Sequence, residues 1–205
     1  TTNYFQQFPK VEVNGTSEAL IVWQDGGYNE VNSKDASGYG IVFQQYSATA
    51  LIPDYFITTW KTDNPGPSND NQITIPTYPG DTYNYSVDWG DGTTDSGITG
   101  DITHTYSTAG TYNVKIIGLF PRIDFSGNTD QLKILTVEQW GSNPWTNFEN
   151  AFEDCENLDL SPATDVPNLD NVTSMYAMFY YCTNLNAGVA NWDVSNIQNM
   201  DDLFY

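Results

Sequence analysis

The sequence predicts a mainly β protein: a small antiparallel β-sandwich, preceded by a β-rich segment and followed by an α/β solenoid of short repeats. Three observations support this fold class. Short runs of β-branched and aromatic residues alternate with Gly- and Asp-rich turns as far as residue 120. The apolar spacing then changes to a helical one. The same stretch also repeats itself, with offsets of 27 and 25 residues between equivalent phenylalanines.

Net charge and residue usage exclude some classes of binding partner and indicate where the protein is found. The 205 residues include 6 Lys and Arg against 26 Asp and Glu, a formal charge of −20. Such a surface repels phosphate backbones, which excludes nucleic acid as a partner. No apolar run reaches the roughly 20 residues of a membrane span, so we expect no membrane insertion by this segment. Few charged residues, many aromatics and an Asp excess are typical of extracellular β-rich proteins, and we expect the chain at the cell surface.

Residues 1–57 form the first predicted zone, a β-rich segment. Residues 20–23 (Leu-Ile-Val-Trp) and 40–43 (Gly-Ile-Val-Phe) have the composition of strands and are separated by glycine-rich turn signals. The motif at residues 5–8 recurs at residues 43–46, which favours a β-repeat array.

Residues 58–120 form the second zone, the predicted sandwich. A Pro-, Asn- and Asp-rich loop precedes its strands, which we expect at residues 72–76, 83–88, 101–106 and 111–118. Short strands at this spacing are typical of a small antiparallel sandwich.

Three motifs in this zone resemble the core of a PKD domain. They are residues 87–93 (Val-Asp-Trp-Gly-Asp-Gly-Thr), 104–106 (His-Thr-Tyr) and 109–114 (Ala-Gly-Thr-Tyr-Asn-Val). The resemblance implies an immunoglobulin-like sandwich of the kind found in extracellular surface proteins and secreted enzymes. It places Trp89 in the sandwich core.

Residues 121–205 form the third zone, the predicted solenoid. We expect residues 132–137 to form the strand that begins it, and short amphipathic helices to follow. The apolar stripes are Phe148, Ala151, Phe152 and Cys155; Met175, Met178, Phe179 and Cys182; and Met200, Leu203 and Phe204. The expected helix N-caps are Asn147, Ser174 and Asn199.

This repeat resembles that of BspA-like leucine-rich surface proteins of bacteria. Residues 191–204 (Asn-Trp-Asp-Val-Ser-Asn-Ile-Gln-Asn-Met-Asp-Asp-Leu-Phe) carry the fullest copy, residues 170–179 fit the same frame, and residues 145–155 are a degenerate copy. The resemblance implies a leucine-rich-repeat-type solenoid. The chain stops within a repeat, so we expect it to be an excerpt of a longer protein.

Acidic residues around the tight turn at Trp89 and Gly90 are candidate calcium ligands. Asp88, Asp91 and Asp95 supply hard oxygen ligands on a glycine-rich turn. The alternative is that Asp91 accepts backbone N–H bonds and holds the turn. We expect no other cofactor.

Aromatic side chains in the solenoid zone are the candidate binding residues. Tyr176, Tyr180 and Tyr181 fall off the apolar stripe and are therefore expected at the surface, and Trp192 belongs to the same set. The alternative is packing against the next repeat. Cys155 and Cys182 occupy equivalent positions in successive repeats, where they form either a disulfide or a buried thiol ladder.

Catalysis is not expected. His104 is the sole histidine, and no nucleophile, metalloprotease or phosphate-loop motif is present. We expect a segment of a large exported surface protein that acts in adhesion, or as an extracellular scaffold, by binding surface glycans or proteins. The first alternative is a non-catalytic binding or spacer module of a secreted glycan- or protein-degrading enzyme. The second is a filament or surface-layer element that self-associates.

Overall fold

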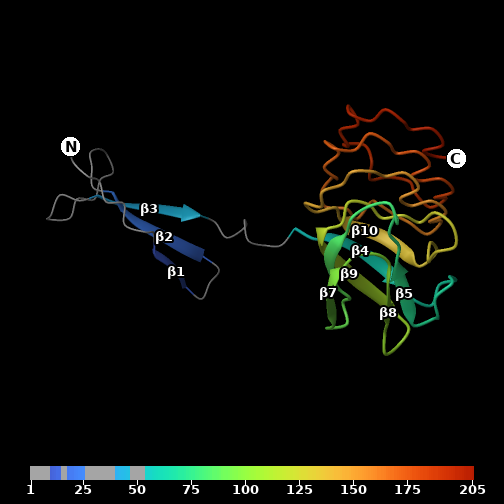
Figure 1. Ribbon diagram of the computed structural model, residues 1–205, viewed down its shortest axis with the longest axis horizontal. Coiled ribbons are helices and arrows are strands. Elements are labelled where there is room, and N and C mark those ends of the chain that lie inside the picture. The colour runs from blue at the N-terminus through green and yellow to red at the C-terminus, as the bar shows by residue number, and fades with distance from the viewer. Residues whose placement is uncertain (1–9, 15–17, 26–39, 47–53) are drawn as a thin grey trace. The chain divides into compact units, whose positions relative to one another are not determined.

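The computed structural model describes residues 10–14, 18–25, 40–46 and 54–205, which fall into two units, Thr1–Pro53 and Asp54–Tyr205 (Figure 1). In the first unit, β1 (Lys10–Asn14), β2 (Glu18–Asp25) and β3 (Gly40–Tyr46) form an antiparallel sheet in that order. The strands expected at residues 20–23 and 40–43 are confirmed. The motif at residues 5–8 lies outside the described residues.

The second unit begins as a sandwich of two antiparallel sheets. One sheet has the order β10-β4-β9-β6-β7 and the other pairs β5 with β8. The strands are β4 (Phe56–Lys61), β5 (Gln72–Ile75), β6 (Asn84–Asp88), β7 (Thr94–Ile98), β8 (Ile102–Thr105), β9 (Thr111–Leu119) and β10 (Ile134–Gln139). The mainly β class and the sandwich are confirmed.

Strand β10 joins this sandwich to the rest of the unit. One edge of β10 pairs with β4, and on the other side the backbone of Asp159 donates to Leu135 at 2.8 Å. The ring of Trp140, just after β10, lies 5.8 Å from both Phe56 and Phe148. The aromatic core of the sandwich is therefore continuous with that of the turns that follow, and the sandwich packs directly against them.

The expected helices are wrong: the residues that the structure describes contain no helix. Each apolar stripe instead lies on consecutive four-residue turns, which we call turn repeats 1 (residues 148–155), 2 (175–182) and 3 (200–205). In turn repeat 1 the N–H groups of Ala151 and Cys155 donate to the carbonyls of Phe148 and Phe152. The third residue of each turn has positive φ, as at Asn150 (53°) and Ala177 (51°), which no helix accepts.

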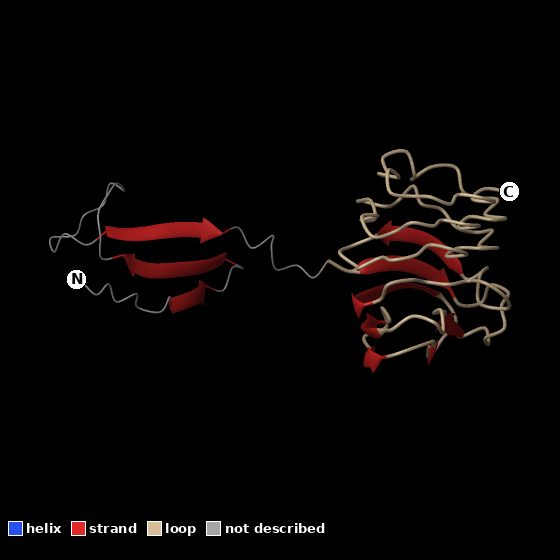
Figure 2. Ribbon diagram, turned by 45° about the horizontal axis from the view of Figure 1, so that its top comes forward, coloured by secondary structure: helices blue, strands red, loops and turns tan. Residues whose placement is uncertain are grey.

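The turn repeats stack in parallel through their backbones (Figure 2). The N–H of Phe148 donates to Ser174, and three further bonds follow at every second residue, each to a residue 26 positions later. Turn repeat 2 donates to turn repeat 3 in the same way, from Met175 to Asn199 onward. Asn147, Ser174 and Asn199 cap turns rather than helices. The side-chain oxygen of each accepts from the backbone N–H two residues later, at 2.7, 3.4 and 2.9 Å.

The stripes of turn repeats 1 and 2 face the core as predicted, although their backbone is not helical, whereas Met200 and Phe204 of the third stripe are exposed. Phe148, Ala151, Phe152 and Cys155 are fully buried. A turn of four residues also places i, i+3, i+4 and i+7 on one face, and over eight residues a period of 4 is indistinguishable from the helical 3.6. The stacked phenylalanines follow this face: Phe152 and Phe179 lie 5.9 Å apart, and Phe179 and Phe204 5.5 Å.

Candidate binding surface

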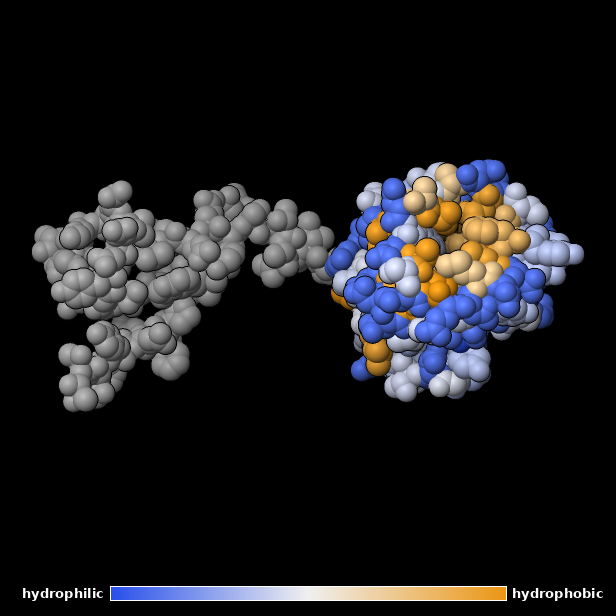
Figure 3. Space-filling view, turned by 90° about the horizontal axis from the view of Figure 1, so that it is seen from above, coloured by the Kyte–Doolittle hydropathy of each residue, from blue (hydrophilic) through white to orange (hydrophobic). Residues whose placement is uncertain are grey.

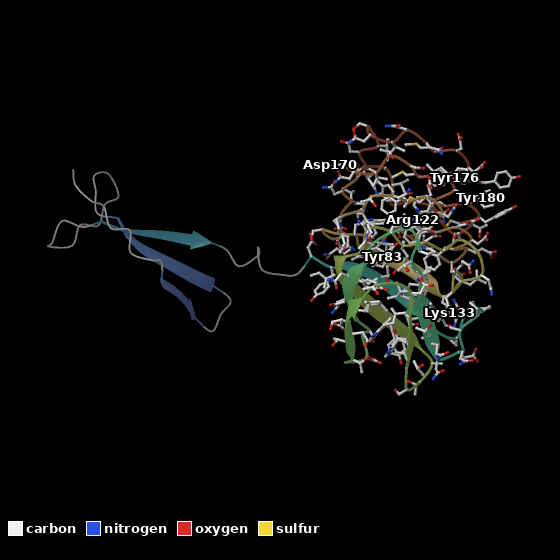
Figure 4. All side chains as sticks on the ribbon, viewed as in Figure 1. Tyr83, Arg122, Lys133, Asp170, Tyr176 and Tyr180 are labelled. Carbon is white, nitrogen blue, oxygen red and sulfur yellow. The ribbon has the colours of Figure 1, made fainter. Side chains whose placement is uncertain are left out.

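Four tyrosines gather on the side of turn repeats 2 and 3. Tyr180 lies 4.6 Å from Tyr181 and stacks on Tyr205 at 5.0 Å and 13°. Tyr181 is 45 % exposed and Tyr176 is 38 % exposed. Figure 4 shows Tyr176 and Tyr180 directed outward on one side of the unit. We call Tyr176, Tyr180, Tyr181 and Tyr205 the tyrosine face.

The turn geometry explains why these side chains point outward. In turn repeats 1 and 2, positions 1 and 4 are directed toward the core, whereas position 2, and position 3 except at the buried Ala177, are at least partly exposed. Tyr176 and Tyr180 hold position 2 and Tyr181 holds position 3. The predicted surface location of these three residues is therefore correct.

Trp192 lies apart from the tyrosine face. Its ring packs at 5.1 Å, edge to face, against the buried Trp140, and at 6.0 Å against Phe179. It is half-buried and contributes to the core, so the structure does not bring it together with the three tyrosines.

Carboxylates surround the tyrosine face. Turn repeat 1 carries Glu149 and Glu153 at position 2, beneath Tyr176 and Tyr180, and turn repeat 3 carries Asp201 above Tyr176. Burial, then the negative charges of Asp154 and Asp124, raise the pKa of Glu153. The pKa of Tyr180 is also raised, by desolvation first and by Asp202 among its neighbours. The face thus combines aromatic rings with negative charge.

The candidate calcium ligands have other partners. Asp88 accepts from the N–H of Gly90 at 3.0 Å, and Asp95 accepts from the Trp89 indole at 2.8 Å. Asp91 accepts from both Thr93 groups, and its second oxygen lies 2.9 Å from Nε2 of His104. Within the described part of the chain, no three acidic, histidine or cysteine side chains form a cluster that could hold a metal. Asp91 holds the turn, the alternative that the sequence left open.

The motif residues around Asp91 pack as one aromatic group. Trp89 stacks on His104 at 4.6 Å, and His104 meets Tyr106 edge-on at 4.5 Å. The hydroxyl of Tyr106 donates to the Trp89 carbonyl at 3.1 Å. Trp89 is fully buried, as the resemblance implied. At Gly90 (φ 77°), a Cβ would collide with the carbonyl of Asn113.

Cys155 and Cys182 are free thiols in the structure. Cys155 is fully buried, and Cys182 donates to the carbonyl of Phe152 at 3.0 Å. Burial raises the pKa of Cys182 to about 12 and that of Cys155 well above its usual value. Both groups are therefore protonated at neutral pH and weakly nucleophilic.

A buried lysine was not identified by sequence reasoning. The ammonium of Lys133, with no exposed surface, donates to the carbonyls of Ser68, Asn69 and Gln72 and to the Ser68 hydroxyl at 2.7–3.1 Å. The carboxylate of Asp130 lies 3.8 Å away and itself accepts from Ser68 and from the N–H of Thr74. This cluster closes the loop before β5 against the segment before β10 (Figure 4).

The end of the stack exposes a second apolar surface. Figure 3 shows apolar side chains inside a hydrophilic rim on the face seen from above, the side of the C-terminal turns. Phe204 is 58 % exposed and Met200 38 %. Among the described residues, the backbone N–H groups of Met200, Asp202 and Phe204 have no backbone acceptor. These N–H groups correspond to the donors by which turn repeats 1 and 2 bond to the repeat that follows them.

Two family models match consecutive parts of this unit. The PKD domain model matches residues 63–118, and the model described as "Mycoplasma protein of unknown function, DUF285" matches residues 125–205. No curated protein and no solved structure matches the chain. The PKD resemblance is confirmed, and the turn repeats fall within the DUF285 match.

These matches indicate an extracellular or surface-associated protein, since PKD domains are common extracellular or surface modules. Within the described residues, no helix is both long enough and apolar enough to cross a bilayer.

Proposed function

We propose that this chain is part of a large exported surface protein that acts in adhesion, or as an extracellular scaffold, by binding proteins or glycans. The tyrosine face carries the proposal. Tyrosines supply large, rigid contact areas at low entropic cost, and they are enriched where proteins recognise one another. Hydrogen bonds between the stacked repeats hold the backbone that carries these tyrosines. Binding therefore does not have to order that backbone first.

The turn repeats are, in this proposal, BspA-like repeats in which turns take the place of helices. Their frame has apolar residues at positions 1 and 4 and variable residues at positions 2 and 3. Such a frame keeps the core constant while the outward side chains set specificity. Many weak contacts along a longer array would add up through multivalency.

Binding to whole cells and to glycan and protein arrays tests the proposal. We expect the labelled chain to bind at least one such surface and the double variant Tyr176→Ser, Tyr181→Ser to lose most of that binding. Val166→Ser is the matched control, since Val166 is equally exposed, at 45 %, and lies outside the turn repeats. Equal loss in the control would contradict a role for the tyrosine face. Failure to bind any surface would favour the spacer module of a secreted enzyme.

A further inference from the structure

The outward face of the turn repeats has a charge pattern that selects its partner. Residues 134–205 contain eleven Asp and Glu and no Lys, Arg or His. Every ion pair in the described residues lies between Lys61 and Lys133 in the chain. The carboxylates of the turn repeats therefore have no cationic partner of their own.

Carboxylates and tyrosine rings occupy the same outward columns of the stack. We call a column the position-2 residues of equivalent turns in turn repeats 1, 2 and 3. The first column consists of Glu149, Tyr176 and Asp201, and the second of Glu153, Tyr180 and Tyr205. Successive members of a column come from hydrogen-bonded neighbouring backbones, which lie about 4.8 Å apart. Both kinds of group attract cations: carboxylates by charge, and aromatic faces by their quadrupole.

We propose that the tyrosine face and its flanking carboxylates bind an extended Lys- and Arg-rich segment of a partner protein. This inference rests on the proposed binding function and specifies the partner. Guanidinium groups stack on tyrosine and pair with carboxylates, so an Arg-rich segment binds more tightly than a Lys-rich one.

Other ligand classes fit the face less well. Anionic glycans are repelled. Neutral glycans can donate hydrogen bonds to the carboxylates, but they carry no positive charge to complement them. Rings of Tyr180, Tyr181 and Tyr205 pack on one another, with Tyr181 nearly perpendicular to both neighbours (77° and 90°), and form no flat sugar platform. A chelated cation would need three or more converging ligands, and the described residues offer no such group.

Fluorescence anisotropy with three labelled decapeptides tests the inference. One peptide alternates Arg with Gly, and the others carry Gln or Glu in place of Arg. We expect saturable binding of the Arg peptide alone, weakened at least tenfold between 50 and 300 mM salt (about two to three pairs screened). Equal or tighter binding of the Gln or Glu peptide would overturn the inference.

Matched variants separate this face from general negative charge. Glu149→Gln with Asp201→Asn neutralises the two carboxylates that flank Tyr176 in its column, with side chains of the same size. This pair of substitutions should raise the dissociation constant for the Arg peptide by about fivefold or more. Tyr181→Ser should raise it by about two- to fivefold. Asp170→Asn removes a charge on the opposite side of the unit (Figure 4) and should change the dissociation constant less than twofold. An equal effect of Asp170→Asn would mean nonspecific attraction and would overturn the inference.

Competition on cells separates this inference from the proposed function. If the Arg peptide competes with cell binding, both the proposed binding function and the basic partner segment are supported. If cell binding depends on Tyr176 and Tyr181 but resists the Arg peptide and salt, the binding function stands and the basic partner is overturned. If no cell or array surface binds, the proposed function fails, whatever the peptide result.

Discussion

At the scale of single residues, two clusters of polar side chains hold loops of the sandwich in place. Lys133 supplies the positive charge that three carbonyls and Asp130 surround, and Asp91 organises the turn after β6. Neither arrangement follows from composition. Lys133 lies in a stretch that reads as an ordinary loop and strand start, and its acceptors are some 60 residues earlier, so no local signal marks it.

Lys133→Met should lower the free energy of unfolding by about 3 kcal/mol, because the truncation leaves buried carbonyls and a buried carboxylate without a cation. Urea unfolding followed by tryptophan fluorescence measures this. Lys61→Met is the control: its ammonium is 42 % exposed and pairs with Asp63, so about 0.5 kcal/mol or less is expected. A similar loss of unfolding free energy in both variants would contradict a stabilising role for the buried contacts of Lys133.

The stability of the sandwich should depend on Asp91 at acid pH. Burial opposes ionisation of Asp91, but hydrogen bonds from Thr93 and His104 outweigh it and lower its pKa from 3.8 to about 2. The folded state therefore binds this proton less readily, and its stabilising effect is present above pH 3.8 and lost as pH falls through 2.

Urea unfolding of the natural chain and Asp91→Asn at several values between pH 2 and 6 measures that dependence. The difference between the two proteins should be constant above about pH 5 and shrink toward pH 2. A difference that stays the same over the whole range would show that the carboxylate charge is not involved.

At the scale of elements, the turn repeats depend on left-handed residues at position 3. Asn150, Asp154 and Asp202 suit that backbone, whereas Ala177 and Tyr181 are strained there. Asn150 and Asp154, four residues apart in turn repeat 1, are a local signal for turns rather than a helix, but turn repeat 2 has Ala177 and Tyr181 there and lacks that signal. Strand β7 was not predicted from the sequence either, because its residues are exposed and mostly polar and show no alternation of apolar and polar side chains.

Ala177→Gly should raise the free energy of unfolding by about 0.5–1 kcal/mol, because glycine adopts positive φ without strain. Ala151→Gly should lower it by about 1 kcal/mol, since Ala151 lacks positive φ and is fully buried. Thermal and urea unfolding give both values. Destabilisation by both glycines would indicate helices and contradict the turn geometry.

At the scale of the whole described unit, one aromatic core carries both family matches. The sandwich and most of its strands could be predicted because their apolar runs and turn residues are local. Strand β4 was not, since the expected boundary between residues 57 and 58 falls inside it. The buried stripes of turn repeats 1 and 2 could be predicted from local spacing, whereas Met200 and Phe204 of the third stripe are exposed. The continuity through Trp140 could not, because it joins Phe56 to Phe148 across more than 90 positions of the chain.

The candidate site was predicted in part. Tyr176, Tyr180 and Tyr181 follow from the frame of the repeat, since any residue off the stripe faces outward. Trp192 lies between repeats, where the frame does not specify direction, and its large apolar ring turned inward against Trp140. The carboxylates opposite the tyrosines become visible only when the register of the stack is known.

Hydroxyl-radical footprinting tests the tyrosine face as the binding surface most directly. With the Arg peptide at saturation, oxidation of Tyr176 and Tyr181 should fall severalfold, while Tyr78, which is 41 % exposed on the sandwich, keeps its rate. Mass spectrometry of the digested chain reads all three in one experiment. Protection of Tyr78 to the same degree, or unchanged oxidation of Tyr176 and Tyr181 in the bound state, would contradict the account.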